Sequence, residues 1–95
     1  MLNTRILEDI VYGFLREARI RYGESWVERI KLSSSKATLY MVVGGERVKA
    51  IIYRDKVKVR VYSRLKGLCI AVQRILEREY IKALKRWERE GEESI

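Results

Sequence analysis

Residues 36–64 read KATLYMVVGGERVKAIIYRDKVKVRVYSR, and this stretch decides the fold. Gly44 and Gly45 accept the positive φ angles of a two-residue hairpin turn. Asp55 and Lys56 make a weaker turn candidate, because lysine is disfavoured in the left-handed conformation. Around both turns the side chains alternate with period two. The stretch therefore predicts three antiparallel strands joined by two tight turns.

The alternation divides these strands into two faces. The first face is wholly apolar, and its members are Ala37, Leu39, Met41, Val43, Val48, Ala50, Ile52, Val57, Val59 and Val61. The second face carries rings and cations between apolar positions, and its members are Thr38, Tyr40, Val42, Arg47, Lys49, Ile51, Tyr53, Lys58, Arg60, Tyr62 and Arg64. We expect the rest of the chain to cover the first face and to leave the second in solvent.

The turn positions also predict the register of the sheet. A turn at 44–45 pairs Tyr40 with Lys49, and a turn at 55–56 pairs Lys49 with Tyr62. A slip of one residue would mix the two faces, so the pattern supports this register. The neighbouring cross-strand rows are then Thr38, Ile51 and Arg60, and Lys36, Tyr53 and Lys58.

Helices flank the predicted strands. Residues 4–22 repeat apolar side chains at helical spacing, with Asn3 or Thr4 as the cap and Gly23 after the end. A second helix begins near Ser63 and runs to about Glu90. The fold class is therefore α+β: an N-terminal helix, a three- to four-stranded antiparallel meander and a long C-terminal helix. We expect one domain over residues 1–90 and a frayed acidic tail at 91–95.

Residues 25–32 allow two interpretations. Trp26, Ile30 and Leu32 alternate as in a strand, whereas Ser25 and Glu28 have the spacing of a helical capping box. We favour a strand from 26 to 32, which makes the sheet four-stranded. Trp26 is then expected to be partly buried at the sheet edge.

The second helix is longer than the sheet it covers. About 25 helical residues span about 37 Å, whereas a strand of seven or eight residues spans about 25 Å. Apolar side chains in the overhang need a cover, either a partner's helix or the first helix folding beneath them. We expect a homodimer through this end, and its predicted contact residues are Tyr80, Ala83, Leu84 and Trp87.

Composition excludes much catalytic chemistry. The chain has no histidine and one cysteine, Cys69, which removes the usual general base and zinc ligands and any internal disulfide. It has no acidic cluster for Mg²⁺ and no phosphate-binding glycine loop. We expect a binding protein rather than an enzyme, with no metal and no cofactor. Without an apolar span or a signal peptide, we expect it to be soluble and cytoplasmic.

Charge indicates a polyanionic partner. Net charge is +8, and residues 36–66 hold nine Lys or Arg against two acidic residues. On the second face, tyrosines offer surfaces for base stacking, and cations follow phosphates, as in single-strand-binding proteins. An ordinary solvent-exposed face is the alternative. The predicted contact residues are Tyr40, Arg47, Lys49, Ile51, Tyr53, Lys58, Arg60, Tyr62 and Arg64.

The order of elements and the basic, tyrosine-bearing sheet at 37–64, followed by the apolar helix at 65–87, resemble the ThermoDBP-related proteins of hyperthermophilic archaea. The resemblance implies a single-strand-binding cleft on the sheet and a C-terminal dimerisation helix. Base stacking and phosphate contact would carry over to Tyr40, Lys49, Tyr53, Lys58, Arg60 and Tyr62. Val42 and Ile51 would supply the apolar floor of the cleft. Few side-chain amides and no histidine also lean toward a thermophile.

Two other functions stay open. The order of elements also resembles the double-stranded RNA-binding domain, although only Arg64 and Lys66 stand where that domain has a lysine cluster. A dimeric adaptor that docks an acidic protein would use tyrosine and arginine equally well. Nothing in the chain separates DNA from RNA.

Overall fold

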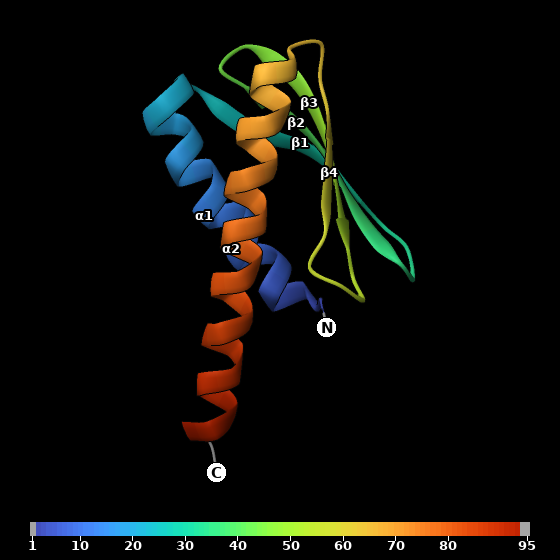
Figure 1. Ribbon diagram of the computed structural model, residues 1–95, viewed down its shortest axis with the longest axis vertical. Coiled ribbons are helices and arrows are strands. Elements are labelled where there is room, and N and C mark those ends of the chain that lie inside the picture. Colours follow the sequence, from blue (N-terminus) through green and yellow to red (C-terminus); the bar gives the residue numbers. More distant parts are fainter. Residues whose placement is uncertain (1, 94–95) are drawn as a thin grey trace.

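The computed structural model describes residues 2–93, with side chains through Glu90 (Figure 1). Its elements are, in chain order, α1 (Thr4–Tyr22), β1 (Ser25–Leu32), β2 (Lys36–Val43), β3 (Glu46–Tyr53), β4 (Val59–Tyr62) and α2 (Lys66–Glu93). The four strands form one antiparallel sheet in the order β1-β2-β3-β4. The predicted α+β class and the order of elements are confirmed. Neither helix in this part of the chain has the length and apolar character that a bilayer span requires.

Helix α1 has the predicted bounds because both ends carry local stop signals. The side chain of Asn3 accepts a hydrogen bond of 2.9 Å from the backbone N–H of Ile6, which caps the first turn. At the other end Gly23 has φ 88°, and its N–H donates to the carbonyl of Arg19 at 3.2 Å. The apolar stripe between these ends is buried against the sheet, as at Ile10 and Phe14.

The central register follows from the glycine turn. Gly44 and Gly45 both have positive φ angles, 56° and 85°, so the turn needs only two residues. Tyr40 pairs with Lys49, and Lys49 pairs with Tyr62, as predicted. The row of Thr38, Ile51 and Arg60 is also formed.

The second turn differs from the prediction. Strand β4 begins only at Val59, because residues 54–58 make a loop rather than a two-residue turn. The N–H of Arg54 donates to the carbonyl of Ser35 at 3.0 Å, which draws the chain away from the β3–β4 ladder. Val57 lies outside the sheet and is 39% exposed, so its predicted core position is wrong.

Strand β1 contains a bulge that the alternation did not predict. The register shifts between Val27 and Arg29, which leaves Glu28 as the extra residue. Residues before and after the bulge therefore alternate in opposite phase. Trp26 lies opposite Val42 on the face away from the helices, whereas Ile30 lies opposite Leu39 on the helix side. The strand interpretation of this segment is confirmed.

Both helices cover the same face of the sheet, and the other face is bare (Figure 1). The core lies between these layers, and its largest fully buried side chains are Tyr80, Phe14, Ile6, Ile10, Leu39, Met41, Ile52, Leu76, Val43, Val59 and Val72. The predicted apolar face is thus buried, apart from Val57 and the partly buried Val61.

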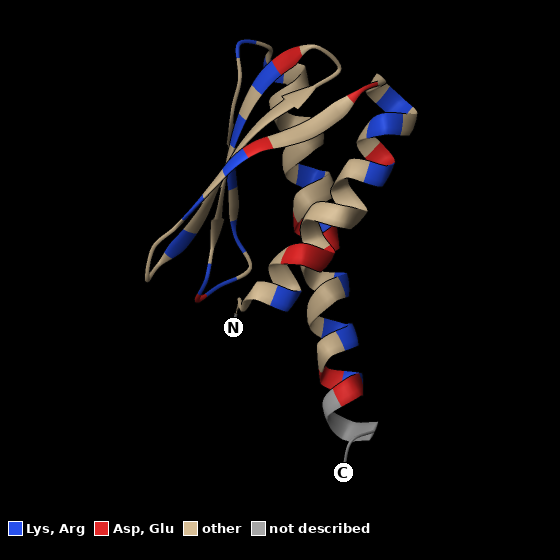
Figure 2. Ribbon diagram, turned by 180° about the vertical axis from the view of Figure 1, so that it is seen from behind, with Lys and Arg blue, Asp and Glu red and all other residues tan. Residues whose placement is uncertain are grey.

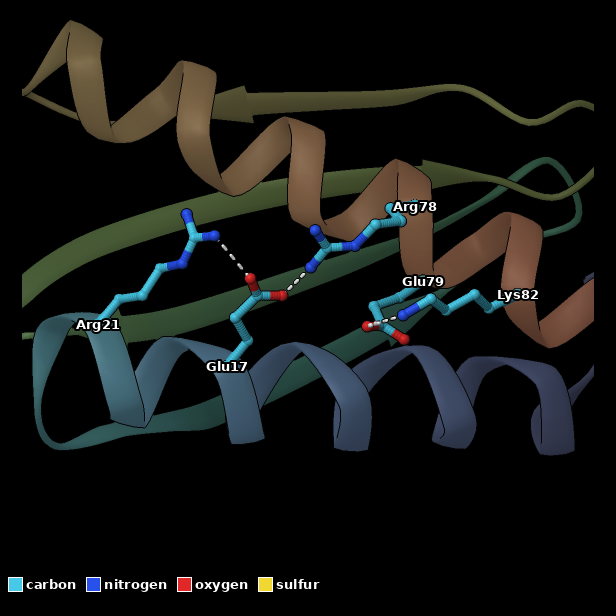
Figure 3. A network of polar contacts seen from close by, with 5 residues as sticks. All are labelled: Glu17, Arg21, Arg78, Glu79 and Lys82. Carbon is cyan, nitrogen blue, oxygen red and sulfur yellow. Dashed lines mark hydrogen bonds and ion pairs between the residues drawn. The ribbon is translucent and has the colours of Figure 1, made fainter.

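Gly13 of α1 is buried and lies against Glu79 of α2. A Cβ there would lie 2.7 Å from Cδ of Glu79, inside contact distance. Figure 3 shows the polar contacts along this crossing: Glu17 pairs with Arg21 and with Arg78 of α2, and Lys82 lies 3.8 Å from Glu79. The glycine therefore makes room for a carboxylate between the helices.

The predicted overhang of α2 is shorter than expected. Tyr80 is fully buried, and its hydroxyl donates to the carbonyl of Tyr53 at 2.7 Å. Ala83 is also buried and Leu84 packs partly against the core, because α1 lies beneath this part of α2. Tyr80 and Ala83 are therefore wrong as dimer contacts, whereas Trp87 is 44% exposed. The backbone is helical through Glu93. The rest of the tail expected at 91–95 lies outside the described residues.

Stability at alkaline pH should depend on Tyr80. Burial raises the pKa of its hydroxyl above the ordinary 10.0; Asp55 adds to the rise and Arg54 opposes it. Its neutral form therefore contributes stability that is complete below about pH 10 and is lost as pH rises toward the raised pKa. Urea unfolding should show a free-energy gap between wild type and Tyr80→Phe that is constant below about pH 10 and shrinks between about pH 10 and about pH 11. A gap that stays constant over this range would contradict the assignment.

Candidate nucleic-acid interface

The open face of the sheet is the side that no helix covers (Figures 1 and 2). By the strand register its members are Trp26, Glu28, Arg29 and Lys31 on β1, Lys36, Thr38, Tyr40 and Val42 on β2, Arg47, Lys49, Ile51 and Tyr53 on β3, and Arg60 and Tyr62 on β4. Figure 2 shows Lys and Arg along the strands and their loops, with few acidic residues among them. The predicted face is thus present. It is larger than predicted because β1 also contributes side chains to it.

A row of alternating cations and rings crosses all four strands. Its residues, the central row, are Arg29, Tyr40, Lys49 and Tyr62, in that order. The guanidinium carbon of Arg29 lies 4.8 Å from the centre of the Tyr40 ring. The ammonium of Lys49 lies 6.0 Å from the Tyr40 ring and 5.9 Å from the Tyr62 ring. One lysine is therefore shared between two tyrosines.

This spacing has a simple geometric origin. Tyr40 and Tyr62 are on strands two apart, so their backbones are about 10 Å from each other, and Lys49 lies on the strand between them. A cation within about 6 Å of an exposed ring is attracted by about 0.5–1 kcal/mol. The contacts hold the long side chains beside the rings.

A second cluster lies at the end of β3. Tyr53 is half-buried, and the ammonium groups of Lys56 and Lys58 lie 5.2 and 5.7 Å from its ring centre. Both lysines belong to the loop at 54–58, which was predicted as a tight turn. Tyr53 is four residues from Lys49 along β3, about 13 Å. The loop therefore places a second ring-and-cation group within reach of the central row.

Two predicted contact residues are engaged by acids. Arg47 lies 3.4 Å from Glu28, and Arg64, just beyond β4, lies 2.9 Å from Glu46. Both arginine side chains are highly exposed, and such surface pairs are worth about 0–1 kcal/mol. The two carboxylates therefore hold these arginine side chains only weakly.

The predicted apolar floor is covered. Ile51 is only 9% exposed, and its row neighbour Thr38 and nearby Val42 are buried to a similar degree. Within residues 2–93 no helix or loop lies over this face (Figure 1), so we attribute the shielding to long side chains on the same face. Ile51 therefore supports the surface from beneath and does not offer a contact area of its own, which corrects its predicted role.

Sequence reasoning missed the members of the open face that β1 contributes. Arg29 and Lys31 were not assigned to it, and Trp26 was expected to pack at the edge, yet it lies on this face and is 43% exposed. The available signal was Glu28, whose charge interrupts the apolar alternation of the strand. A charged residue at that position is explained by a bulge that returns the later residues to the helix side.

The described residues contain no group of three or more His, Cys, Asp or Glu side chains that could hold a metal ion. The open face instead brings aromatic rings and cations side by side. No protein-family model, curated protein or solved structure matches the chain.

Proposed function

We propose that the protein is a cytoplasmic binder of single-stranded DNA or RNA with little sequence specificity. The observation that carries this proposal is the central row, in which two tyrosines and two cations alternate across a bare sheet face. Every base has a π-face, so stacking on rings tolerates any sequence, and Lys and Arg contact the common backbone. Membership in the ThermoDBP-related proteins belongs to the same proposal.

Each group on the open face has a distinct task in this proposal. Tyr62, 49% exposed, offers its ring to one base, while the guanidinium plane of Arg29 over Tyr40 offers another stacking surface. Lys49 lies between these two positions and neutralises the phosphate that joins them. Arg60 lies beside this path on β4, and the Tyr53 cluster extends it toward the loop at 54–58.

Unpaired bases suit this surface better than a duplex. In a duplex the base faces are already stacked, so the tyrosines would gain nothing and only phosphate contacts would remain. The double-stranded RNA alternative relies on cations at the start of the last helix, where Arg64 is paired with Glu46. A protein adaptor would use the same rings but needs no unpaired polynucleotide.

Fluorescence anisotropy with labelled single-stranded DNA, single-stranded RNA and duplex, each across a salt series, tests the proposal. We expect the single strands to bind much more tightly than the duplex. With about four contacted phosphates, log affinity should fall with log salt at a slope of about −3. Equal affinity for all three would show a basic patch without stacking. No binding at moderate salt would favour the adaptor.

A homodimer, predicted from the length of the C-terminal helix, also stays a proposal. With Tyr80 and Ala83 buried, the large exposed apolar side chains on this part of α2 are Ile81 and Trp87. The guanidinium of Arg5 lies 5.8 Å from the Trp87 ring, so part of that surface is occupied. A dimer through α2 would therefore have a small apolar contact.

A further inference from the structure

The outer edge of β1 is the longest open edge of the sheet. Strand order places β1 and β4 at the two edges, and β1 has eight residues whereas β4 has four. Within residues 2–93 no strand pairs with the outer side of β1. An edge of this length presents a row of backbone donors and acceptors that another strand can pair with.

An apolar groove runs beside this edge on the helix side. It has a volume of about 430 Å³, and its lining consists of Thr4, Leu7, Glu8, Val11, Tyr12 and Leu15 of α1 with Ile30 and Leu32 of β1. Ile30 is 43% exposed and Leu32 is 59% exposed, although both point to the helix side of the sheet. The apolar layer between sheet and helices therefore extends to the β1 edge, where its side chains stay exposed to solvent.

The edge also carries features that prevent indiscriminate pairing. Glu28, Arg29 and Lys31 are charged, and the bulge at Glu28 reverses the alternation of the strand. Charges and bulges are the usual protection of edge strands against foreign strands. A strand without a matching bulge would place its polar side chains over the apolar groove along half of β1. The occupant must therefore match both the charges and the bulge.

A second copy of β1, running antiparallel, meets both conditions. When Glu28 lies opposite Arg29 of the second copy, Val27 faces Ile30 on the helix side and Trp26 faces Lys31 on the open face. Each of these pairs occurs twice because of the two-fold symmetry. A shift of one residue sets Glu28 against Glu28, or Arg29 against Arg29, and mixes the two faces. The bulge thus leaves one self-complementary register.

We propose that two copies of this chain associate through their β1 edges, which joins their two sheets into a single eight-stranded sheet. Opposite charges and apolar pairs facing one another across strands stabilise such a ladder. The two grooves close on each other, since Val11 and Leu15 of α1 lie beside the apolar side chains at the join. The open faces of both copies lie on the same side of the joined sheet. This association stands whether or not that face binds nucleic acid.

Charge reversal at the join tests the proposal. Light scattering and sedimentation over a concentration series should show a dimer of the wild-type chain. Arg29→Glu places four carboxylates at the two-fold axis, and the dimer dissociation constant should rise by about tenfold or more. The double variant Glu28→Arg/Arg29→Glu restores opposite charges in the same positions and should restore the dimer. Circular dichroism of each variant confirms that the protomer is folded.

A matched control distinguishes this edge from the C-terminal helix. Ile81→Glu/Trp87→Glu places two charges on the exposed part of α2 and should leave the dimer intact. The proposal is overturned if the wild-type chain is monomeric throughout its soluble range. It is equally overturned if the α2 variant dissociates the dimer while Arg29→Glu does not, or if the charge-swapped double variant fails to recover association.

Discussion

Tyr40→Ala/Tyr62→Ala is expected to bind single-stranded DNA about 30-fold or more weakly than the wild-type chain. A base stacked on the Tyr62 ring contributes about 1–3 kcal/mol, the Tyr40 ring supports the Arg29 guanidinium on which a second base stacks, and each 1.4 kcal/mol is tenfold in affinity. Both rings belong to the open face and contact the ammonium of Lys49, so removing them also removes the two contacts that position this lysine. Anisotropy with a labelled oligonucleotide at fixed salt measures the loss.

Two control variants make this result specific. Tyr40→Phe/Tyr62→Phe retains both rings and should keep most of the affinity. Trp87→Ala removes a ring of similar exposure from α2, away from the open face, and should leave the affinity unchanged. If the double alanine variant binds as tightly as the wild-type chain, the sheet face is not a stacking surface. The salt slope should be nearly the same for all three, because the phosphate-contacting cations remain.

Tyr80→Ala is expected to cost about 3–5 kcal/mol of unfolding free energy, the usual range for removing a buried aromatic side chain. Tyr80 is fully buried, and its hydroxyl donates a hydrogen bond to the carbonyl of Tyr53, the last residue of β3. For a domain of this size such a loss lowers the Tm by more than about 12 °C. Thermal and urea unfolding followed by circular dichroism measure both quantities.

The two parts of this effect can be separated. Tyr80→Phe keeps the ring and removes only the hydrogen bond to the carbonyl of Tyr53, so it should cost about 1–2 kcal/mol. Tyr62→Ala removes an exposed tyrosine and should change stability by less than about 1 kcal/mol. A loss at Tyr80→Ala no larger than that at Tyr62→Ala would contradict the packing of α2 against the end of the sheet.

Local signals explain the elements that were predicted well. Asn3 and Gly23 bound α1, because a cap and a left-handed glycine act within a few residues of the chain. Gly44 and Gly45 set the β2–β3 register, and the strict alternation along β3 carried that register on to β4. The central row follows from these two facts, except for its first member on β1.

The features that were not predicted depend on contacts between distant residues. The bulge at Glu28 shows its effect only when β1 is placed against β2. The loop at 54–58 leaves the ladder because Arg54 bonds to Ser35 and to the carbonyl of Leu2, which are far away in the chain. Tyr80 is buried where its hydroxyl reaches the carbonyl of Tyr53 at the end of β3, and nothing in the pattern of α2 alone shows that contact.

The positions of the two tryptophans allow binding to be followed by intrinsic fluorescence. Trp26 lies on the open face beside the β1 edge, and Trp87 lies on α2, on the other side of the molecule. In a Trp87→Phe chain, all indole emission would come from Trp26. Quenching by an added oligonucleotide and a spectral shift on dilution could then be followed in one cuvette without any label. Trp26 would thus report oligonucleotide binding on the open face and association through the β1 edge as two separable signals.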